Sequence, residues 1–219
     1  MMENKKGEVY FVSGIDTDAG KSYCTAWLGL QLLNSGRRVI TQKFVQTGNV
    51  GHSEDIDLHR RIMGTGYLEE DRLGLTMPEI YSYPCSPHLA ARIDGRPIDL
   101  HKIESAMDEL ARRYEVVLVE GAGGLMVPLT EDYLTIDYIA DSHLPLVFVT
   151  SGKLGSLNHT LLSFEAIQRR HIELHTVLYN LYPTVDDSTI QEDTRQYVET
   201  YLANHFPRAR FLLVPEIKS

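Results

Sequence analysis

A phosphate-binding loop is the clearest chemical feature of this sequence. Residues 14–22 read Gly-Ile-Asp-Thr-Asp-Ala-Gly-Lys-Ser, and they connect an apolar run to a helical stretch. Glycines let backbone N–H groups surround phosphate oxygens, and a helix N-terminus adds partial positive charge. Lys21 would reach the β- and γ-phosphates of a nucleotide, and the Ser22 hydroxyl would bind Mg²⁺. Five residues separate the glycines where the standard Walker A pattern has four, so an ordinary turn before a capped helix is the alternative.

Other polar residues follow the remaining apolar runs. Ligands of doubly wound sheets bind beyond the carboxyl ends of the strands, so these side chains meet at one edge if the sheet is parallel. The residues that end or follow such runs are Lys43, Thr47, Glu120 with the glycine-rich segment 121–124, Ser151, Lys153 and Asn180. Lysines, a carboxylate and a glycine-rich loop are the groups that Mg-nucleotide chemistry needs.

Most of these residues also have a simpler structural interpretation. Glu120 is either a metal ligand or a solvated strand end. Asp55 is either a second Mg²⁺ ligand or a helix N-cap. Lys43 is a site residue or a plain surface lysine. Asn180 either reads a purine edge or caps a turn, and the glycines at 121–124 either allow close approach of a ligand or form a turn.

The elements that must position these residues alternate between strand and helix. Short apolar runs predict strands at 9–12, 39–43, 115–120, 146–149, 176–179 and 211–214. Between them, the pattern predicts helices at 21–35, 55–63, 100–113, 135–141, 158–170 and 188–204. Residues 64–97 are rich in Gly, Pro and Tyr and are expected to be irregular. The alternation predicts an α/β fold, a mostly parallel sheet flanked by helices in three layers, as in P-loop NTPases.

Composition narrows the class of protein. The 219 residues suit one domain spanning 1–219, and the net charge of -9 disfavours generic binding to nucleic acid or to an anionic membrane. Cys24 and Cys85 fit neither a metal-binding nor a disulfide pattern. The first eight residues are polar, and no apolar run approaches the roughly 20 residues of a membrane helix, so a cytoplasmic location is expected.

Several segments in order resemble the dethiobiotin synthetase family, which acts in biotin synthesis. The matching segments are 10–22, 43–48, 86–88, 119–125, 128–129 and 153–159, and Glu-Gly-Ala-Gly-Gly at 120–124 is the most specific of them. The five-residue spacing of the phosphate loop is typical of this family. The resemblance implies that the enzyme is a ligase: 7,8-diaminononanoate, CO₂ or bicarbonate and ATP give dethiobiotin, ADP and phosphate through a carbamate and a carbamic–phosphoric anhydride.

The resemblance also implies residue roles, position by position. Lys43 and Lys21 would be catalytic, and Ser22, Asp55 and Glu120 would hold Mg²⁺. The nucleotide would contact Asp18, Ala19, Gly20, Lys21, Ser22, Tyr23, Asp55, Glu120, Gly121, Ala122, Gly123, Asn180 and Pro215. The substrate would contact Thr17, Thr47, Lys153, Leu154, Gly155 and Asn158. Family members are homodimers that bind the substrate carboxylate at the subunit interface, near 154–158.

The sequence departs from the family at two places. Leu181 follows Asn180 where an acidic residue is frequent, and the chain is short after Pro215. Two other classes share the fold. Amide synthetases of the cobyrinic-acid type usually add a glutamine-cleaving domain, for which 219 residues leave little room. Partitioning ATPases carry a signature lysine early in the phosphate loop, where this chain has Asp16.

Overall fold

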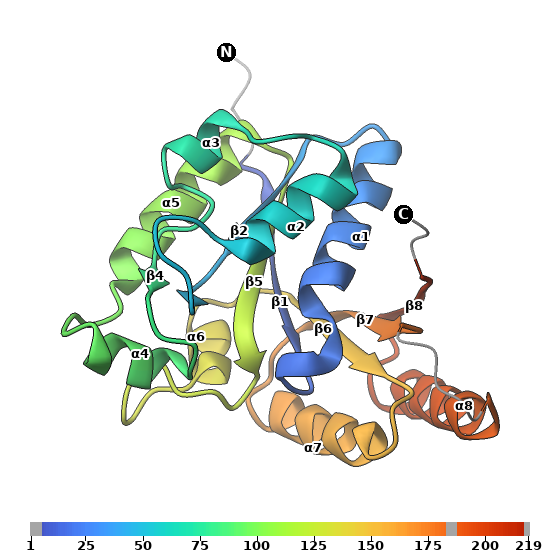
Figure 1. The fold of residues 1–219 in the computed structure, drawn as a ribbon. Coiled ribbons are helices and arrows are strands. Elements are labelled where there is room, and N and C mark those ends of the chain that lie inside the picture. The colour runs from blue at the N-terminus through green and yellow to red at the C-terminus, as the bar shows by residue number, and fades with distance from the viewer. Residues whose placement is uncertain (1–5, 183–187, 217–219) are drawn as a thin grey trace.

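A computed structural model describes residues 6–182 and 188–216 (Figure 1). Within these residues, the main sheet has six strands in the order β2-β5-β1-β6-β7-β8, and every neighbouring pair is parallel. The strands are β1 (Glu8–Gly14), β2 (Val39–Lys43), β5 (Val116–Gly124), β6 (Leu146–Ser151), β7 (Leu174–Asn180) and β8 (Arg210–Val214). The predicted parallel sheet is therefore confirmed.

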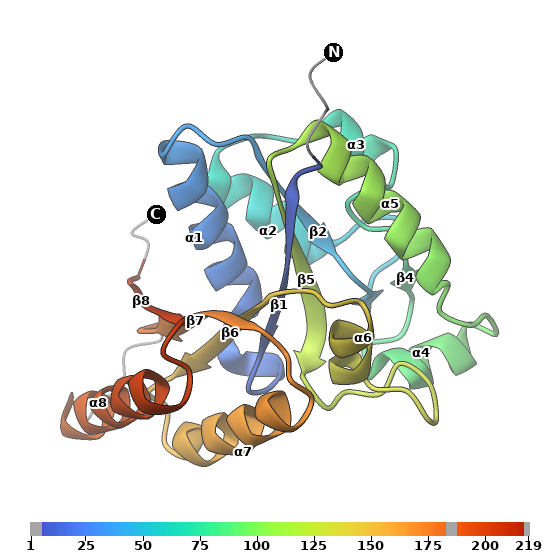
Figure 2. The same ribbon diagram turned by 180° about the vertical axis from the view of Figure 1, so that it is seen from behind.

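Helices cover both faces of this sheet, which gives three layers. One face carries α1 (Lys21–Asn34) and α2 (Glu54–Met63), which lie in front of the strands in Figure 1. The view from behind shows helices over the other face (Figure 2). These are α5 (Leu100–Arg113), α6 (Thr135–Asp141), α7 (Ser156–Arg169) and α8 (Ser188–His205). The predicted α/β class with three layers is confirmed.

Alternation along the strands explains why there are two cores. Successive side chains of a strand point to opposite faces. Phe11 packs into the core shared with α5 to α8, whereas the next residue, Val12, packs into the core shared with α1 and α2. Val117 and Leu118 repeat this division in β5. Burying each such side chain contributes about 1.5–3 kcal/mol, so the nearly continuous apolar runs reflect burial on both faces.

The strand register brings polar residues together at the carboxyl edge. In the β2–β5 pair, Lys43 lies opposite Glu120, and in the β6–β7 pair, Ser151 lies opposite Asn180. The phosphate loop leaves the same edge after β1, between the two halves of the sheet. The edge where ligands bind in this class of fold thus collects most of the chemically active residues.

The expectation that residues 64–97 are irregular holds for most of the segment but misses three short elements. This segment contains α3 (Glu69–Arg72), β4 (Ile80–Tyr81) and α4 (Pro87–Ile93). Strand β4 pairs in parallel with β3 (Gln46–Thr47) in a separate two-stranded sheet. These elements are too short to produce a periodic pattern. The buried Glu79 beside β4 accepts hydrogen bonds from Tyr81 in β4 and from the more distant Arg96 and Lys102.

Smaller corrections concern element boundaries. Strand β5 continues through the glycine-rich segment to Gly124, and α7 begins at Ser156, two residues earlier than predicted. No helix in 6–182 or 188–216 combines the length and apolar character that crossing a bilayer requires. Most of the polar stretch before Glu8 lies outside the described residues, as do residues 217–219 of the short C-terminal segment.

Candidate active site

The phosphate loop joins β1 to α1 through a 3₁₀ turn, Thr17–Ala19. Gly20 follows with a φ of 83°, a conformation that favours glycine, and a Cβ at this position would collide with the Asn180 amide. Asn180 Nδ2 donates a hydrogen bond of 3.1 Å to the Ala19 carbonyl. The loop is therefore anchored to the end of β7, and the sequence positions predicted to bind phosphate open α1 as expected.

Lys21 lies beneath this loop. Its Nζ donates to the carbonyl of Asp16 at 2.6 Å and to that of Thr17 at 3.3 Å, and the side chain is 4% exposed. Burial, followed by repulsion from the ammonium of Lys43, lowers the pKa of Lys21 to about 8. The site thus holds two lysines close enough to repel each other, which favours binding of an anion between them.

Three oxygen atoms from distant positions meet beside the first turn of α1. Ser22 Oγ lies 2.6 Å from Asp55 Oδ1 and 2.7 Å from Glu120 Oε1. Asp55 stands in the first turn of α2, whose N-cap is Ser53, so the N-cap alternative for Asp55 is wrong. Glu120 is fully buried within β5 and is not a solvated strand end.

Lys43, at the end of β2, contacts the cluster formed by Ser22, Asp55 and Glu120. Its Nζ lies 2.6 Å from Asp55 Oδ2 and 2.8 Å from Glu120 Oε1, and it donates to the Gly121 carbonyl at 3.2 Å. Burial alone would lower the pKa of Lys43, but the charges of Glu120 and Asp55 outweigh burial and raise it. The same lysine is the main attraction that lowers the pKa of Glu120 against the opposing effect of burial. Lys43 is 5% exposed and is not a surface lysine.

The donor set of the cluster fits a hard divalent cation. A serine hydroxyl has one hydrogen and can donate to only one carboxylate, so its second short contact brings two oxygens together. A cation bound by Ser22, Asp55 and Glu120 would relieve that contact, and Mg²⁺ prefers such oxygen ligands. Within the described residues, no group of three or more His, Cys, Asp and Glu side chains is arranged for a metal, and the set here combines two carboxylates with the Ser22 hydroxyl.

Three residues predicted to bind the nucleotide, Tyr23, Asn180 and Pro215, also lie together. Tyr23 donates a hydrogen bond of 2.9 Å to the Pro215 carbonyl and stacks on Tyr182, with ring centroids 5.8 Å apart. Both ends of the Asn180 amide have partners, since its Oδ1 accepts from the Tyr182 N–H at 3.1 Å. Asn180 therefore has a structural role of the turn-capping kind that the sequence left open.

A pocket of about 390 Å³ adjoins the cluster, and we name it the Thr47 pocket. Thr17 and Thr47, both predicted to bind substrate, lie in its wall together with Ala122 and Gly123. The remaining lining residues were not predicted as site residues: Pro84, Cys85, Ser86, Pro87 and Val127. The pocket combines polar threonines with an apolar wall, and its size lies within the range of small-molecule sites.

Four residues predicted to bind substrate lie elsewhere in this chain. Lys153, Leu154, Gly155 and Asn158 are exposed around the N-terminus of α7, and none of them lines the Thr47 pocket. Leu154 is 80% exposed, which is unusual for a leucine.

His59 is the site residue that sequence reasoning missed. It is fully buried on α2, and its Nε2 lies 2.8 Å from Glu120 Oε2. A signal was present, because His59 follows Asp55 by four residues and such pairs share one face of a helix.

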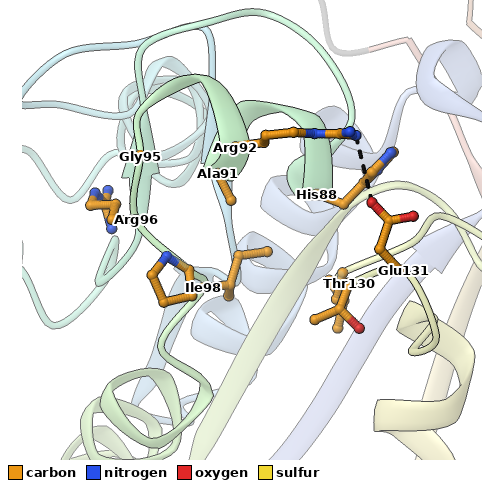
Figure 3. A pocket seen from close by; sticks show the side chains of 10 residues that line it. His88, Ala91, Arg92, Gly95, Arg96, Ile98, Thr130 and Glu131 are labelled. Carbon is orange, nitrogen blue, oxygen red and sulfur yellow. Dashed lines mark ion pairs between the residues drawn. The ribbon is translucent and has the colours of Figure 1, made fainter.

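A second pocket of about 340 Å³ lies beside α4 (Figure 3). His88, Ala91 and Arg92 of α4 line it, and Arg92 forms an ion pair of 3.7 Å with Glu131 across it. No residue that the sequence predicted to bind a ligand lines this pocket. The residues predicted to do the chemistry therefore lie outside this second pocket.

Comparison with known proteins decides the family. A family model described as AAA domain matches residues 8–219. The ATP-dependent dethiobiotin synthetase BioD 2 of Pasteurella multocida (strain Pm70) is 46% identical over 204 residues, which cover 93% of this chain and 95% of that protein. The chain belongs to the dethiobiotin synthetase family. This is a family of ATP-dependent ligases, as the sequence motifs indicate.

Other dethiobiotin synthetases match to a similar degree. The protein of Haemophilus ducreyi (strain 35000HP / ATCC 700724) is 47% identical over 208 residues, covering 95% of this chain and 98% of that protein. The protein of Chlorobaculum tepidum (strain ATCC 49652 / DSM 12025 / NBRC 103806 / TLS) is 44% identical over 200 residues, with coverages of 91% and 83%.

Solved structures show the same fold in other families. The structure of pNOB8 ParA bound to nonspecific DNA matches with a TM-score of 0.56 and 13% identity, covering 96% of this chain and 86% of that one. A putative plasmid partition protein from Borrelia burgdorferi B31 bound to AMPPNP also matches with a TM-score of 0.56, at 11% identity, with coverages of 97% and 89%. Identities this low establish the P-loop NTPase fold alone.

Proposed function

We propose that the protein closes a cyclic urea on 7,8-diaminononanoate, using CO₂ and ATP to give dethiobiotin, ADP and phosphate. The observation that carries this proposal is the position of Lys43. Its ammonium lies 2.8 Å from Glu120, the residue opposite it in the neighbouring strand β5. The end of β5 continues into the wall of the Thr47 pocket, and the chain belongs to the dethiobiotin synthetase family. A lysine held between a nucleotide site and a substrate pocket suits the joining of two anions.

The proposed reaction has three steps. One amine of the substrate adds to CO₂ and loses a proton, which gives a carbamate. A carbamate oxygen then attacks the γ-phosphorus of ATP, ADP leaves, and a carbamic–phosphoric anhydride forms. The second amine attacks the carbonyl carbon, the C–O bond to phosphate breaks, and the ring closes with loss of one proton. Phosphate therefore leaves with an oxygen that came from CO₂.

The lysines of the site would make the second step possible. The carbamate and the triphosphate are both anionic and repel each other in water. Lys21 and Lys43 place two ammonium groups where these anions would meet, and fixed charges in a buried site stabilise the charge that develops in the transition state. Neither lysine acts as a nucleophile in this scheme, and Thr17 and Thr47 would hold the substrate beside them.

Ser22, Asp55 and Glu120 would hold Mg²⁺, which would neutralise phosphate charge when bound. We also propose that residues 1–219 act as one catalytic domain in the cytoplasm, where ATP is available, and that nucleic acid and membrane are not partners.

We further propose that the enzyme works as a homodimer. The substrate-binding residues carried over from the family at 153–158 lie outside the Thr47 pocket of the same chain. A partner subunit would bring the N-terminus of its α7 to this pocket, where backbone N–H groups suit a substrate carboxylate. The exposed Leu154 would be buried by the same contact.

The two rival functions have less support. The partitioning ATPases match this chain in fold at 11–13% identity, whereas dethiobiotin synthetases match at 44–47%. Asp16, with its acidic side chain, stands where those ATPases carry a signature lysine. Against the amide synthetases stands the match to dethiobiotin synthetases, which covers 91–95% of this chain.

The test measures phosphate release with purified protein, ATP, Mg²⁺ and bicarbonate, with and without 7,8-diaminononanoate, and detects dethiobiotin by mass. We expect release to depend on the diamine and to match the dethiobiotin formed. Release that ignores the diamine, or that rises with DNA or lipid instead, would favour a nucleotide switch and overturn the proposal.

A further inference from the structure

Glu120 is held at both carboxylate oxygens. Its Oε1 faces Ser22 at 2.7 Å and Lys43 at 2.8 Å. Its Oε2 lies 2.8 Å from His59 Nε2, and neither side chain has exposed area. A carboxylate only accepts hydrogen bonds, so the hydrogen of this contact belongs to Nε2. With one oxygen anchored in this way, the carboxylate cannot rotate, and Oε1 stays directed at the cluster.

A chain of buried groups continues from the other ring nitrogen of His59. Nδ1 lies 3.0 Å from Thr41 Oγ1, and Arg60 Nη1 donates to the same oxygen at 2.9 Å. Asp71 fixes the guanidinium in a two-pronged pair, with Nε to Oδ2 at 2.9 Å and Nη2 to Oδ1 at 2.8 Å. Arg60 is 4% exposed and Asp71 2%, so water does not compete for these bonds.

The number of hydrogens available to these groups decides which nitrogen of the His59 ring carries a hydrogen. Arg60 can only donate, so it uses one lone pair of Thr41 Oγ1 and leaves the hydroxyl hydrogen in need of an acceptor. Among the described residues, the one acceptor within hydrogen-bond distance of that hydroxyl is His59 Nδ1. Thr41 therefore donates to Nδ1, and the ring hydrogen that faces Glu120 lies on Nε2. Each hydrogen bond in the series from Arg60 through Thr41 and His59 to Glu120 then has one donor and one acceptor.

We propose that His59 is a positioning residue for Glu120, and that Arg60 and Thr41 fix it in the Nε2–H tautomer that holds this carboxylate toward Ser22 and Lys43. The inference rests on the proposed function, in which Glu120 binds the metal of the Mg-nucleotide. Outer partners that orient a ligand in this way typically change metal affinity or activity by about 10- to 100-fold when they are removed.

Two substitutions at one position separate positioning from simple core packing. In His59→Gln, the amide reaches about as far as Nε2 and still donates to Glu120. In His59→Asn, the shorter amide reaches about as far as Nδ1, so it keeps Thr41 and loses Glu120. Both variants remove part of the same buried ring, so thermal unfolding should show similar losses of stability in the two.

The readout is Mn²⁺ binding in the presence of ADP, followed by electron paramagnetic resonance of the free ion, with kcat and KM for the diamine measured alongside. We expect His59→Asn to lose about 10- to 100-fold in Mn²⁺ affinity and in kcat, and His59→Gln to retain most of both. Equal affinities in the wild type and both variants, or equal losses in the two variants, would overturn the proposal.

Thr41→Val gives a second test through a double-mutant cycle. We expect it to weaken Mn²⁺ binding in the wild type and to have little effect in His59→Gln, where the relay to Nδ1 is already absent. The same weakening in both backgrounds would contradict the relay. Because Mn²⁺ binding needs no diamine, these outcomes stand even if no dethiobiotin forms, so failure of the proposed function is distinguished from failure of this inference.

The tautomer itself has a spectroscopic signature. In the ligand-free protein, nitrogen chemical shifts of the imidazole, assigned by comparison with His59→Gln, report which ring nitrogen carries hydrogen. We expect hydrogen on Nε2 alone. Hydrogen on Nδ1, alone or together with Nε2, would overturn the assignment.

Discussion

At the scale of the residue, Lys43 is charged in a place where burial opposes charge. Its ammonium is 5% exposed and contacts two carboxylates and one carbonyl, which use its three hydrogens. Glu120 and Asp55 hold the pKa of Lys43 above its ordinary value. The lysine thus stays charged at neutral pH, which an electrostatic role in phosphoryl transfer requires.

The first prediction concerns Lys43→Ala. We expect turnover to fall by at least about 100-fold, the scale of losing one well-placed electrostatic group, while the fold is retained. The measurement is diamine-dependent phosphate release, with circular dichroism for the fold. Lys6→Ala is the matched control, because Lys6 forms an exposed ion pair with Asp108 and should leave turnover unchanged. Near-wild-type turnover in Lys43→Ala would remove Lys43 from the mechanism.

The second prediction concerns the metal. Without Lys43, the carboxylates of Asp55 and Glu120 lose a shared cation, which costs about 3 kcal/mol for a buried pair. A divalent cation would replace that charge. Mg²⁺ should therefore raise the unfolding temperature of Lys43→Ala more than that of the wild type, each compared with a sample in chelator. Equal shifts in the two proteins would contradict binding of the cation at Asp55 and Glu120.

At the scale of the element, long periodic patterns were predictable and short elements were not. The helix expected at 100–113 coincides with α5, whose apolar residues recur at helical spacing. In contrast, β4 has two residues and α4 has seven, so neither shows a period. This segment is held in place by Glu79, which accepts hydrogen bonds from Tyr81, Arg96 and Lys102. Such contacts between distant positions leave no local signal.

The third prediction tests Glu79 through pH. Burial raises the pKa of Glu79, but hydrogen bonds from Tyr81, Lys102 and Arg96 outweigh it and lower the pKa. A carboxylate with a lowered pKa adds stability above its unfolded pKa of about 4.3, and this stability is lost as the pH falls through the folded pKa.

Glu79→Gln should therefore be less stable than the wild type at pH 7, by about 1–2 kcal/mol because Arg96 and Lys102 are partly exposed. The difference should shrink as the pH falls below about 4. Urea unfolding of both proteins across this range measures it. A difference that stays constant with pH would contradict a charged Glu79.

At the scale of the whole molecule, the parallel sheet accounts for how the site could be anticipated. Parallel strands end at one edge, so the sequence indicated that Ser22, Lys43 and Glu120 would converge. The strand order was not predictable, because apolar runs do not say which strands are neighbours. The spacing from Asp55 places His59 on the same face of α2, but the sequence does not say which strand that face covers, so the contact with Glu120 of β5 was not predictable.

The fourth prediction concerns assembly. Light scattering should give twice the chain mass of 24.8 kDa. Leu154→Glu should weaken the dimer and raise KM for the diamine with little change in ADP affinity, since a charge would replace an apolar contact at the proposed interface. Leu73→Glu is the matched control, because Leu73 is also exposed but lies next to α3. A monomer with full activity would contradict the homodimer.

The most direct test of the proposed mechanism follows the oxygen of CO₂ through the reaction. The protein is supplied with ¹⁸O-labelled bicarbonate, unlabelled ATP and 7,8-diaminononanoate, and phosphate and dethiobiotin are analysed by mass at short times. The proposed mechanism predicts equal amounts of the two products, with one labelled oxygen in each phosphate and one in each cyclic urea. Phosphate without label, or phosphate formed without dethiobiotin, would contradict it.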